Sequence, residues 1–217
     1  MVEFYKGKIM TLKVAYFQPV TLAIDSVPPV EFSKVYALAE NLHQHPELDD
    51  QGDPLLSIRG GQQIQVLPNS LGIDVDWLIA WLEQMCQGYM ELVTQQSGAE
   101  ELKLCRPKIV SIWTIRQYEG DYQEMHTHPR GHLSGNIYIS APELADNSKP
   151  SDGKILFRLP QTKDVSKFIM NDTWKYTPTP GTMIVFPSHL PHTVYPWKGQ
   201  GHRTVMAFDA VIVPKDE

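Results

Sequence analysis

Apolar residues recur every three or four positions between Asp74 and Gln96, with polar residues filling the positions between them. This spacing lines apolar side chains along one side of a helix, behind acidic residues that favour a helix N-terminus. The pattern predicts the longest helix of the chain. We expect it to pack on a sheet through a stripe made of Trp77, Leu78, Trp81, Leu82, Met85, Tyr89 and Leu92.

The first part of the chain has a mixed pattern. Residues 13–24 alternate between apolar and polar side chains, which predicts a strand. Residues 29–45 carry Val35, Leu38 and Leu42 at helical spacing, which predicts a helix. Residues 1–106 are therefore expected to form a helical and mixed N-terminal part.

Beyond Pro107 the pattern changes to short runs rich in β-branched and aromatic residues, broken by Gly, Pro, Asn and Asp. Strands are predicted at 108–118, 135–140, 153–159, 181–186 and 203–213. Several short strands at close spacing indicate a sandwich or barrel, here mainly β with helices on one face. Because no repeat or low-complexity linker divides the chain, we expect a single domain over 1–217, in which 1–106 packs on a β core at 107–213.

The charge and composition of the chain narrow the classes of partner. With 19 Lys and Arg against 25 Asp and Glu, the formal net charge is −6, and no run of clustered basic residues is found. We therefore expect neither nucleic acid nor a membrane surface as a partner. Two cysteines, no secretion signal and no apolar run of about 20 residues predict a cytoplasmic protein.

The candidate chemistry lies in the segment EMHTHPRGHLSG, residues 124–135, which holds three of the eight histidines. If residues 123–128 are extended, the side chains of His126 and His128 point to the same face and can share one metal ion. An HxH pair alone is also common in polar loops. A metal site therefore requires a third ligand from a distant strand.

His192 is the candidate for that third ligand. It follows a turn at Pro180-Gly181 and the apolar run 182–186, and it ends the segment FPSHLPH before another extended run. His189 precedes it on a turn and is expected to be a loop residue. The remaining histidines outside these segments, His43, His45 and His202, are expected to have ordinary surface roles.

Taken together, these motifs resemble a known family. Trp113, the block GDY at 120–122, HTHP at 126–129, SG at 134–135 and Tyr138 precede the pattern G…FPSHLPHTV…R. This combination is similar to the 2-oxoglutarate/Fe(II)-dependent oxygenases, including prolyl-4-hydroxylase-like members, and above all to an uncharacterised bacterial and phage branch. The resemblance covers about residues 109–213. It implies a double-stranded β-helix core, the jelly roll that cupins share, with Fe(II) as the metal and 2-oxoglutarate as the co-substrate.

The resemblance also implies roles for individual residues. It makes His126 and His192 metal ligands and Arg203 the partner of the far carboxylate of 2-oxoglutarate, with Tyr138 on the same carboxylate; no catalytic residue beyond the metal ligands is implied. A planar guanidinium suits that carboxylate because it can form two parallel hydrogen bonds. Since the segment between His192 and Arg203 contains a Pro and two Gly, we expect the two residues on adjacent antiparallel strands, both facing into the barrel.

The resemblance breaks down at His128. Most of these oxygenases have a carboxylate at that position, as part of a two-histidine-one-carboxylate triad. Three imidazoles with an open position also suit zinc, so the sequence leaves the metal open. Cupins offer an alternative: their first motif places a Glu near His132, which makes His132 a possible additional site residue or third ligand, and Arg203 an ordinary strand residue.

Three functions therefore stay open at this point. The resemblance implies an oxygenase that decarboxylates 2-oxoglutarate to succinate while it hydroxylates an unknown substrate. The alternatives are a cupin-type metalloenzyme, which binds its substrate directly at the metal, and a non-enzymatic jelly-roll binding module. The substrate, a small molecule or a protein side chain, is expected to meet the loops at 141–151 and 161–174. A homodimer is compatible with the sequence, which leaves the oligomeric state open.

Overall fold

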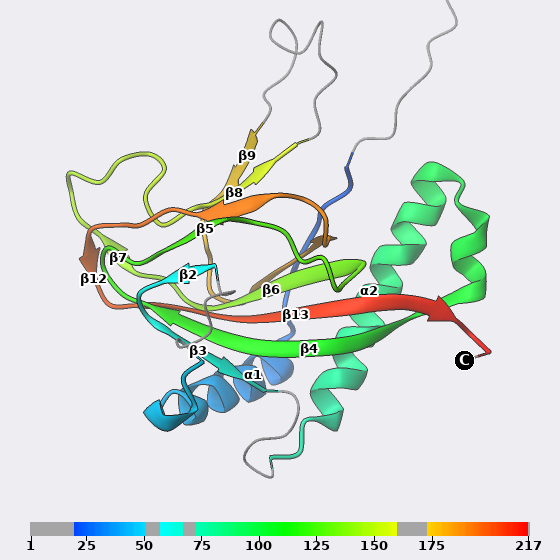
Figure 1. The fold of residues 1–217 in the computed structure, drawn as a ribbon, viewed down its shortest axis with the longest axis horizontal. Coiled ribbons are helices and arrows are strands. Elements are labelled where there is room, and N and C mark those ends of the chain that lie inside the picture. The colour runs from blue at the N-terminus through cyan, green and yellow to red at the C-terminus, as the bar shows by residue number, and fades with distance from the viewer. Residues whose placement is uncertain (1–19, 51–56, 67–72, 160–172, 217) are drawn as a thin grey trace, which may run out of the picture.

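The structure is a computed structural model that describes residues 20–50, 57–66, 73–159 and 173–216. Two antiparallel sheets face one another across a shared apolar interior (Figure 1). The larger sheet has the order β1 (Ala23–Ser26), β10 (Thr182–Pro187), β6 (Leu133–Ser140), β13 (Arg203–Pro214), β4 (Cys105–Gln117) and β3 (Gln62–Gln65). The smaller sheet has the order β2 (Ile58–Arg59), β5 (Tyr122–His126), β11 (His192–Val194), β8 (Ile155–Arg158) and β9 (Thr173–Tyr176).

The strands predicted beyond Pro107 are found as β4, β6, β8, β10 and β13. On the four strands of the larger sheet, β4, β6, β10 and β13, the side chains alternate between two apolar clusters, as the pleat of a strand requires. On β13, Val205 and Ala207 join the cluster between the sheets, whereas Met206, Phe208 and Ala210 join the cluster under the helices. Arg203 and Asp209 therefore belong to the inner face of β13, Arg203 at its start and Asp209 near its middle.

The helices α1 (Pro29–Leu42) and α2 (Asp76–Ser97) cover the outer face of the larger sheet, together with short 3₁₀ turns at Pro46–Leu48 and Glu100–Leu104. The long helix ends at Gly98, which adopts a left-handed conformation with φ of 70° and donates its N–H to the Thr94 carbonyl. Neither described helix combines the length and the hydropathy that crossing a membrane requires.

The stripe predicted on α2 is correct in its first half and wrong at Leu92. Leu78, Trp81, Leu82 and Tyr89 are buried, but Leu92 is 45% exposed. The line of contact instead follows positions four apart, from Leu78 through Leu82, Cys86 and Met90 to Thr94. Because each such step advances about 40° beyond a full turn, the buried face rotates around the helix and leaves Leu92 in solvent.

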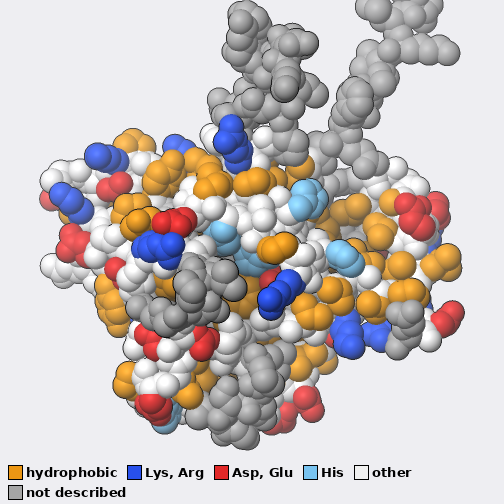
Figure 2. All heavy atoms as spheres, viewed as in Figure 1, with side chains coloured by type: hydrophobic (Ala, Val, Ile, Leu, Met, Phe, Trp, Pro, Cys, Tyr) orange, Lys and Arg blue, Asp and Glu red, His pale blue; other side chains and the backbone are white. Residues whose placement is uncertain are grey.

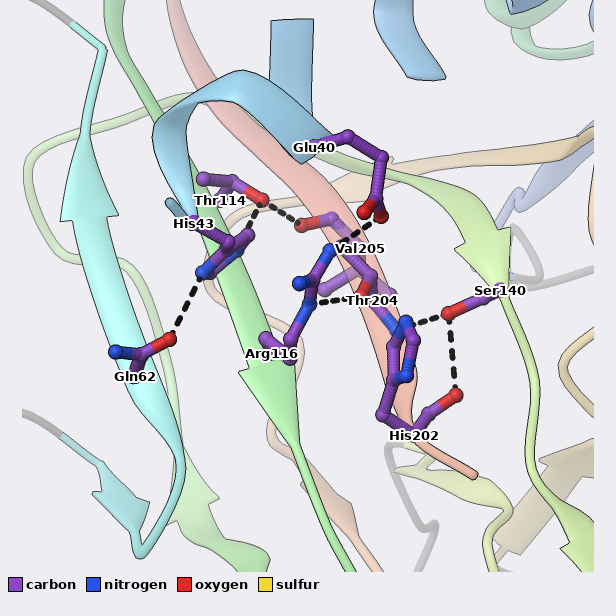
Figure 3. A network of polar contacts seen from close by, with 9 residues as sticks. All are labelled: Glu40, His43, Gln62, Thr114, Arg116, Ser140, His202, Thr204 and Val205. Atoms are coloured by element: carbon purple, nitrogen blue, oxygen red, sulfur yellow. Dashed lines mark hydrogen bonds and ion pairs between the residues drawn. The ribbon is translucent and has the colours of Figure 1, made fainter. Parts of the chain in front are cut away.

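A polar network joins α1 to the outer face of the larger sheet (Figure 3). Arg116 of β4 pairs with Glu40 of α1 and donates from Nε to the Thr204 hydroxyl at 3.0 Å. His43 follows α1 and lies 3.1 Å from the Thr114 hydroxyl through Nε2. The expectation of a surface role is wrong for His43, which is only 8% exposed, because the C-terminal end of α1 sits directly over β4.

Two of the expected segments differ in extent from the structure. Of the strand predicted at 13–24, residues 23–24 begin β1, residues 20–22 are not in a strand, and residues 13–19 lie outside the described residues. The expected loop at 141–151 contains β7 (Glu143–Leu144), which pairs with β12 (Gly199–Gln200). Residues 161–172 of the second expected loop also lie outside the described part of the chain.

Candidate metal centre

Three elements bring the candidate ligands together. His126 is the last residue of β5, His192 is the first residue of β11, and the pairing of these strands sets the two histidines directly opposite one another. His128 lies two residues beyond the end of β5, not on the strand as expected. Its backbone N–H donates to the Ser188 carbonyl at 2.8 Å, which turns the loop back over His192.

The three imidazoles form a compact group. One ring nitrogen from each of His126, His128 and His192 can be chosen so that all three lie within 4.8 Å of one another. The ring centroids are 4.2 Å apart for His126 and His192 and 5.2 Å apart for the other two pairs. Figure 2 shows histidine side chains gathered near the middle of one face of the molecule. Such a separation lets a single ion contact all three rings.

Hydrogen bonds fix the tautomer of each ring. The Nδ1 atoms of His126 and His192 lie 2.7 Å and 3.0 Å from the backbone carbonyls of Glu124 and Leu190. The Nδ1 atom of His128 lies 2.8 Å from a carboxylate oxygen of Asp209. Because these oxygens can only accept, each Nδ1 carries the hydrogen and each Nε2 keeps a free lone pair.

Burial keeps two of the three rings neutral. It lowers the pKa of His126 to about 4, and the neighbouring His128 contributes in the same direction. Burial also lowers the pKa of His192 well below its usual value, with the neighbouring His126 as the second cause. Neutral imidazole is the form that binds a metal, so these two rings are ready to act as ligands at neutral pH. The Nε2 atom of His128 is buried and has no hydrogen-bond partner among the described residues.

The structure does not bring His132 into this group. Its ring Nδ1 accepts a hydrogen bond of 2.8 Å from the backbone N–H of Ile212, and its backbone N–H donates to the Ala210 carbonyl. The side chain of His132 is therefore hydrogen-bonded to β13 and is not part of the cluster that the described histidines form. His189 lies exposed on the turn after β10, as expected.

Arg203 is buried at the start of β13, with 2% of its surface exposed. Its guanidinium donates to the Gln117 side-chain oxygen and, at 3.2 Å, to the Gly153 carbonyl. It also lies 5.0 Å from the centre of the Trp197 ring, a cation–π distance. Burial lowers the pKa of Arg203 to about 10, which leaves the guanidinium charged at neutral pH.

The expectation that His192 and Arg203 lie on adjacent strands is wrong. His192 belongs to β11 of the smaller sheet and Arg203 to β13 of the larger sheet. The segment between them crosses from one sheet to the other and pairs on the way through β12. Gly199 is required there, because an added Cβ would overlap the Glu143 carbonyl oxygen. The two residues therefore approach the interior from opposite walls.

Polar atoms without partners gather around Arg203. The Gln117 side-chain nitrogen, the Tyr138 hydroxyl and the Trp197 indole nitrogen are buried and have no hydrogen-bond partner among the described residues. Burial raises the pKa of Tyr138, so its hydroxyl stays protonated and can donate. Sequence reasoning identified Tyr138 and Arg203 but missed Gln117 and Trp197. A set of buried donors without acceptors is typical of a site for an anionic group.

Comparison with known proteins agrees with this arrangement. Residues 111–209 match the family described as "Putative 2OG-Fe(II) oxygenase". The match to the 2OG-Fe(II) oxygenase family includes all three histidines, Tyr138 and Arg203, and it confirms the resemblance predicted from the histidine motifs. No curated protein matches the sequence.

Solved structures of 2OG-Fe(II) oxygenases share the fold at low sequence identity. A prolyl-4-hydroxylase from Pseudomonas putida is 18% identical with a TM-score of 0.55, over 88% of this chain and 93% of that chain. HygX from Streptomyces hygroscopicus, solved with nickel and 2-oxoglutarate bound, is 11% identical with a TM-score of 0.54, over 90% and 83%. A prolyl hydroxylase from Trichoplax adhaerens, in complex with a hypoxia inducible factor peptide fragment, is 14% identical with a TM-score of 0.55, over 87% and 82%. The predicted fold class, a jelly-roll core with flanking helices, is confirmed.

Proposed function

We propose that this chain is an Fe(II)- and 2-oxoglutarate-dependent oxygenase, with His126, His128 and His192 as the metal ligands. The observation that carries the proposal is the convergence of three imidazoles whose Nδ1 hydrogens are all engaged elsewhere. Their Nε2 lone pairs have no other described use, and the buried Nε2 of His128 in particular lacks a partner. Unpaired buried nitrogens of this kind are costly unless an ion completes them.

The donor set fits Fe(II). Imidazole is a suitable ligand for iron, and three protein ligands leave positions open for a co-substrate and oxygen. When bound, Fe(II) would supply the oxygen chemistry that couples decarboxylation of 2-oxoglutarate to hydroxylation of a substrate. The chain's own contribution is to hold the three rings in one tautomer, to keep His126 and His192 neutral, and to shield the site partly from water.

The donors around Arg203 fit the far carboxylate of 2-oxoglutarate. Arg203, Gln117 and Tyr138 together offer a charged guanidinium, an amide N–H and a phenol O–H in a buried setting. The carboxylate would satisfy the atoms that lack partners and would gain a charge-assisted pair. HygX binds nickel and 2-oxoglutarate on a similar fold, which supports this assignment.

The position of His132 does not favour the cupin alternative, because its ring is engaged with the edge of β13. We propose as substrate a small molecule or a protein side chain. The peptide fragment held by the Trichoplax adhaerens prolyl hydroxylase is consistent with the second type. Within this proposal the protein acts in the cytoplasm, and no residue beyond the metal ligands is assigned a catalytic role.

Anaerobic titration of the Fe(II)-loaded protein with 2-oxoglutarate tests the proposal. The parent protein should develop the visible charge-transfer band of a keto acid chelated to Fe(II), and His192→Ala should not. A protein that binds one equivalent of iron but shows no band and no affinity for 2-oxoglutarate would favour the cupin alternative. A protein that binds no metal at all would favour a non-enzymatic binding module.

A further inference from the structure

The candidate ligand set contains no carboxylate, but a carboxylate lies directly behind one ligand. Asp209 is on the inner face of β13, and its Oδ1 atom is 2.8 Å from Nδ1 of His128. The sequence separates the two residues by 81 positions, and only the crossing of the two sheets brings them together. Asp209 is thus positioned to act on the metal site through the ring of His128.

Asp209 is a buried acid with an unusual set of partners. It is 8% exposed, and His128 is its only ion-pair partner among the described residues. The Ser134 hydroxyl donates to the same Oδ1 at 2.6 Å. None of the described Lys and Arg residues forms an ion pair with Asp209, so its carboxylate is directed to His128 and Ser134.

The contacts around Asp209 form a closed ring that fixes His128. Ser134 links Asp209 to Ser188 through a hydroxyl contact of 2.9 Å. The carbonyl of Ser188 in turn accepts the backbone N–H of His128. The ring is also tightly packed, because a Cβ added to Gly131 would lie 2.7 Å from the Ser188 hydroxyl and 3.3 Å from Cβ of Asp209. Hydrogen bonds to Ser188 and Asp209 therefore hold both the backbone and the side chain of His128.

We infer that Asp209 is a positioning residue that supplies, through His128, the negative charge which a two-histidine-one-carboxylate site takes from a direct ligand. The inference rests on the proposed function, because it requires the histidine cluster to hold a divalent ion. A carboxylate that accepts the Nδ1 hydrogen of a ligand histidine orients the ring and makes its Nε2 a stronger donor. The net charge of the ion, its three histidine ligands and Asp209 then equals the net charge of an ion in the usual triad. The carboxylate lies behind a ligand instead of binding the ion directly.

The tautomer of His128 provides a first test, on the metal-free protein. Nitrogen-15 NMR of the imidazoles should show His128 protonated at Nδ1 in the parent and in Asp209→Asn, whose amide oxygen can still accept. Asp209→Ala should lose this preference, while His126 and His192 keep theirs and serve as internal controls. An unchanged His128 signal in the alanine variant would overturn the inference.

Metal affinity provides the second test and separates charge from hydrogen bonding. Competition between the protein and a chelator for Co(II), without 2-oxoglutarate, should show affinity about 10–100-fold weaker in Asp209→Ala, the range typical of residues that support a ligand histidine. Asp209→Asn should also weaken binding, by about 10-fold, because it keeps the hydrogen bond but not the charge. Asp25→Asn, on the exposed edge strand β1, removes the same charge far from the cluster and should bind Co(II) like the parent.

Each outcome of the affinity test decides one point. If the parent binds no Co(II), the proposed function fails and the inference fails with it. If the parent binds Co(II) and the asparagine variant binds it equally well, the inference fails and the proposed function stands. If the alanine variant changes the ligand-field spectrum of bound Co(II) to that of a site with one ligand fewer, Asp209 is itself a ligand, and the positioning role is overturned.

Discussion

Arg203 is the residue that separates the oxygenase from its alternatives. A cupin-type site has no need for a buried cation in the wall opposite the metal, whereas a five-carbon keto diacid requires one for its far carboxylate. The guanidinium is 2% exposed and keeps its charge, and unsatisfied donors surround it. Its removal should therefore act on the co-substrate and not on the metal.

We predict that Arg203→Ala retains metal but binds 2-oxoglutarate roughly 30-fold to several-thousand-fold more weakly. The loss of a charge-assisted pair in a buried setting typically costs about 2–5 kcal/mol, which corresponds to that range. Arg203→Lys should lose less, because it keeps the charge but not the fork of donors. Anaerobic calorimetric titration of the metal-loaded variants measures the effect.

The matched control is Arg106→Ala. Arg106 lies at the start of β4, where it pairs with Val213 at the opposite end of β13, and its loss should leave 2-oxoglutarate affinity unchanged. Thermal melts of all three variants show whether they fold. Equal affinity of Arg203→Ala and the parent for 2-oxoglutarate would remove Arg203 from the site.

At the scale of single residues, the sequence predicts the site residues that lie within a short motif. It misses those that only the fold brings near the site. The motifs that carry the resemblance contain His126, His128, His192, Tyr138 and Arg203. Asp209 belongs to none of these motifs. Its only signal is an acidic residue inside the apolar run 203–213, and nothing local identifies His128 as its partner. The same holds for Gln117, whose contact with Arg203 spans 86 positions.

Among the elements, α1 depends on a buried titratable group. His43 contacts the Thr114 hydroxyl and Gln62, and burial lowers its pKa to about 4, with the charge of Arg116 as the second cause and His202 as a smaller one. Glu40 neutralises part of the Arg116 charge across the same network (Figure 3). The docking of α1 is therefore favoured when His43 is neutral.

The sign of the pH effect follows from this shift. An unfolded histidine has a pKa of about 6.5, so between pH 6.5 and 4 the unfolded chain binds a proton at His43 that the folded chain does not. The free energy of unfolding must then fall as the pH falls through this window. For a ring in this setting the full effect is on the order of 1–3 kcal/mol.

We predict that His43→Gln reduces the loss of stability between pH 7 and pH 5. Urea unfolding with a metal chelator present measures the free energy of unfolding of parent and variant at both pH values. His126 and His192 also titrate below their usual range, but they are common to both proteins and cancel in the comparison. Gln44→Ala, at the exposed neighbouring position, changes no titratable group and should keep the pH dependence of the parent. A parallel pH dependence in His43→Gln would contradict the assignment.

The strands of the β half were predictable because each is a short run with a period of two. Their assignment to sheets was not. Pro196 and the two glycines before Arg203 suggest a tight reversal, which would place His192 and Arg203 side by side. The chain instead crosses to the other sheet, and Trp197, which is 2% exposed, lies against the Arg203 guanidinium on the way. Local turn signals cannot distinguish a hairpin from such a crossing, because both use the same residues.

At the scale of the whole molecule, the larger sheet contributes residues to two apolar clusters, one on each of its faces. Its outer face packs with α1 and α2, and its inner face packs with the smaller sheet. Residues such as Met206 and Val205 are neighbours on β13 but lie in different clusters. We propose that this shared sheet makes the N-terminal part and the jelly roll a single folding unit, because neither cluster can be lost without exposing one face of β13.

We predict that Leu82→Ala on α2 lowers the stability of the whole chain, by about 2–5 kcal/mol for a fully buried leucine. Leu92→Ala makes the same chemical change on the same helix, but Leu92 is 45% exposed, so its effect should stay within about 0.5 kcal/mol.

In urea, a helix signal from far-ultraviolet circular dichroism and a tertiary signal from the buried indoles should shift together in Leu82→Ala. Native-state hydrogen exchange then locates the effect. In one folding unit, the slowest amides of β8, which belongs to the smaller sheet, lose protection by the same free energy as those of α2. If β8 kept the protection of the parent while α2 lost it, the helical layer and the barrel would be separate units.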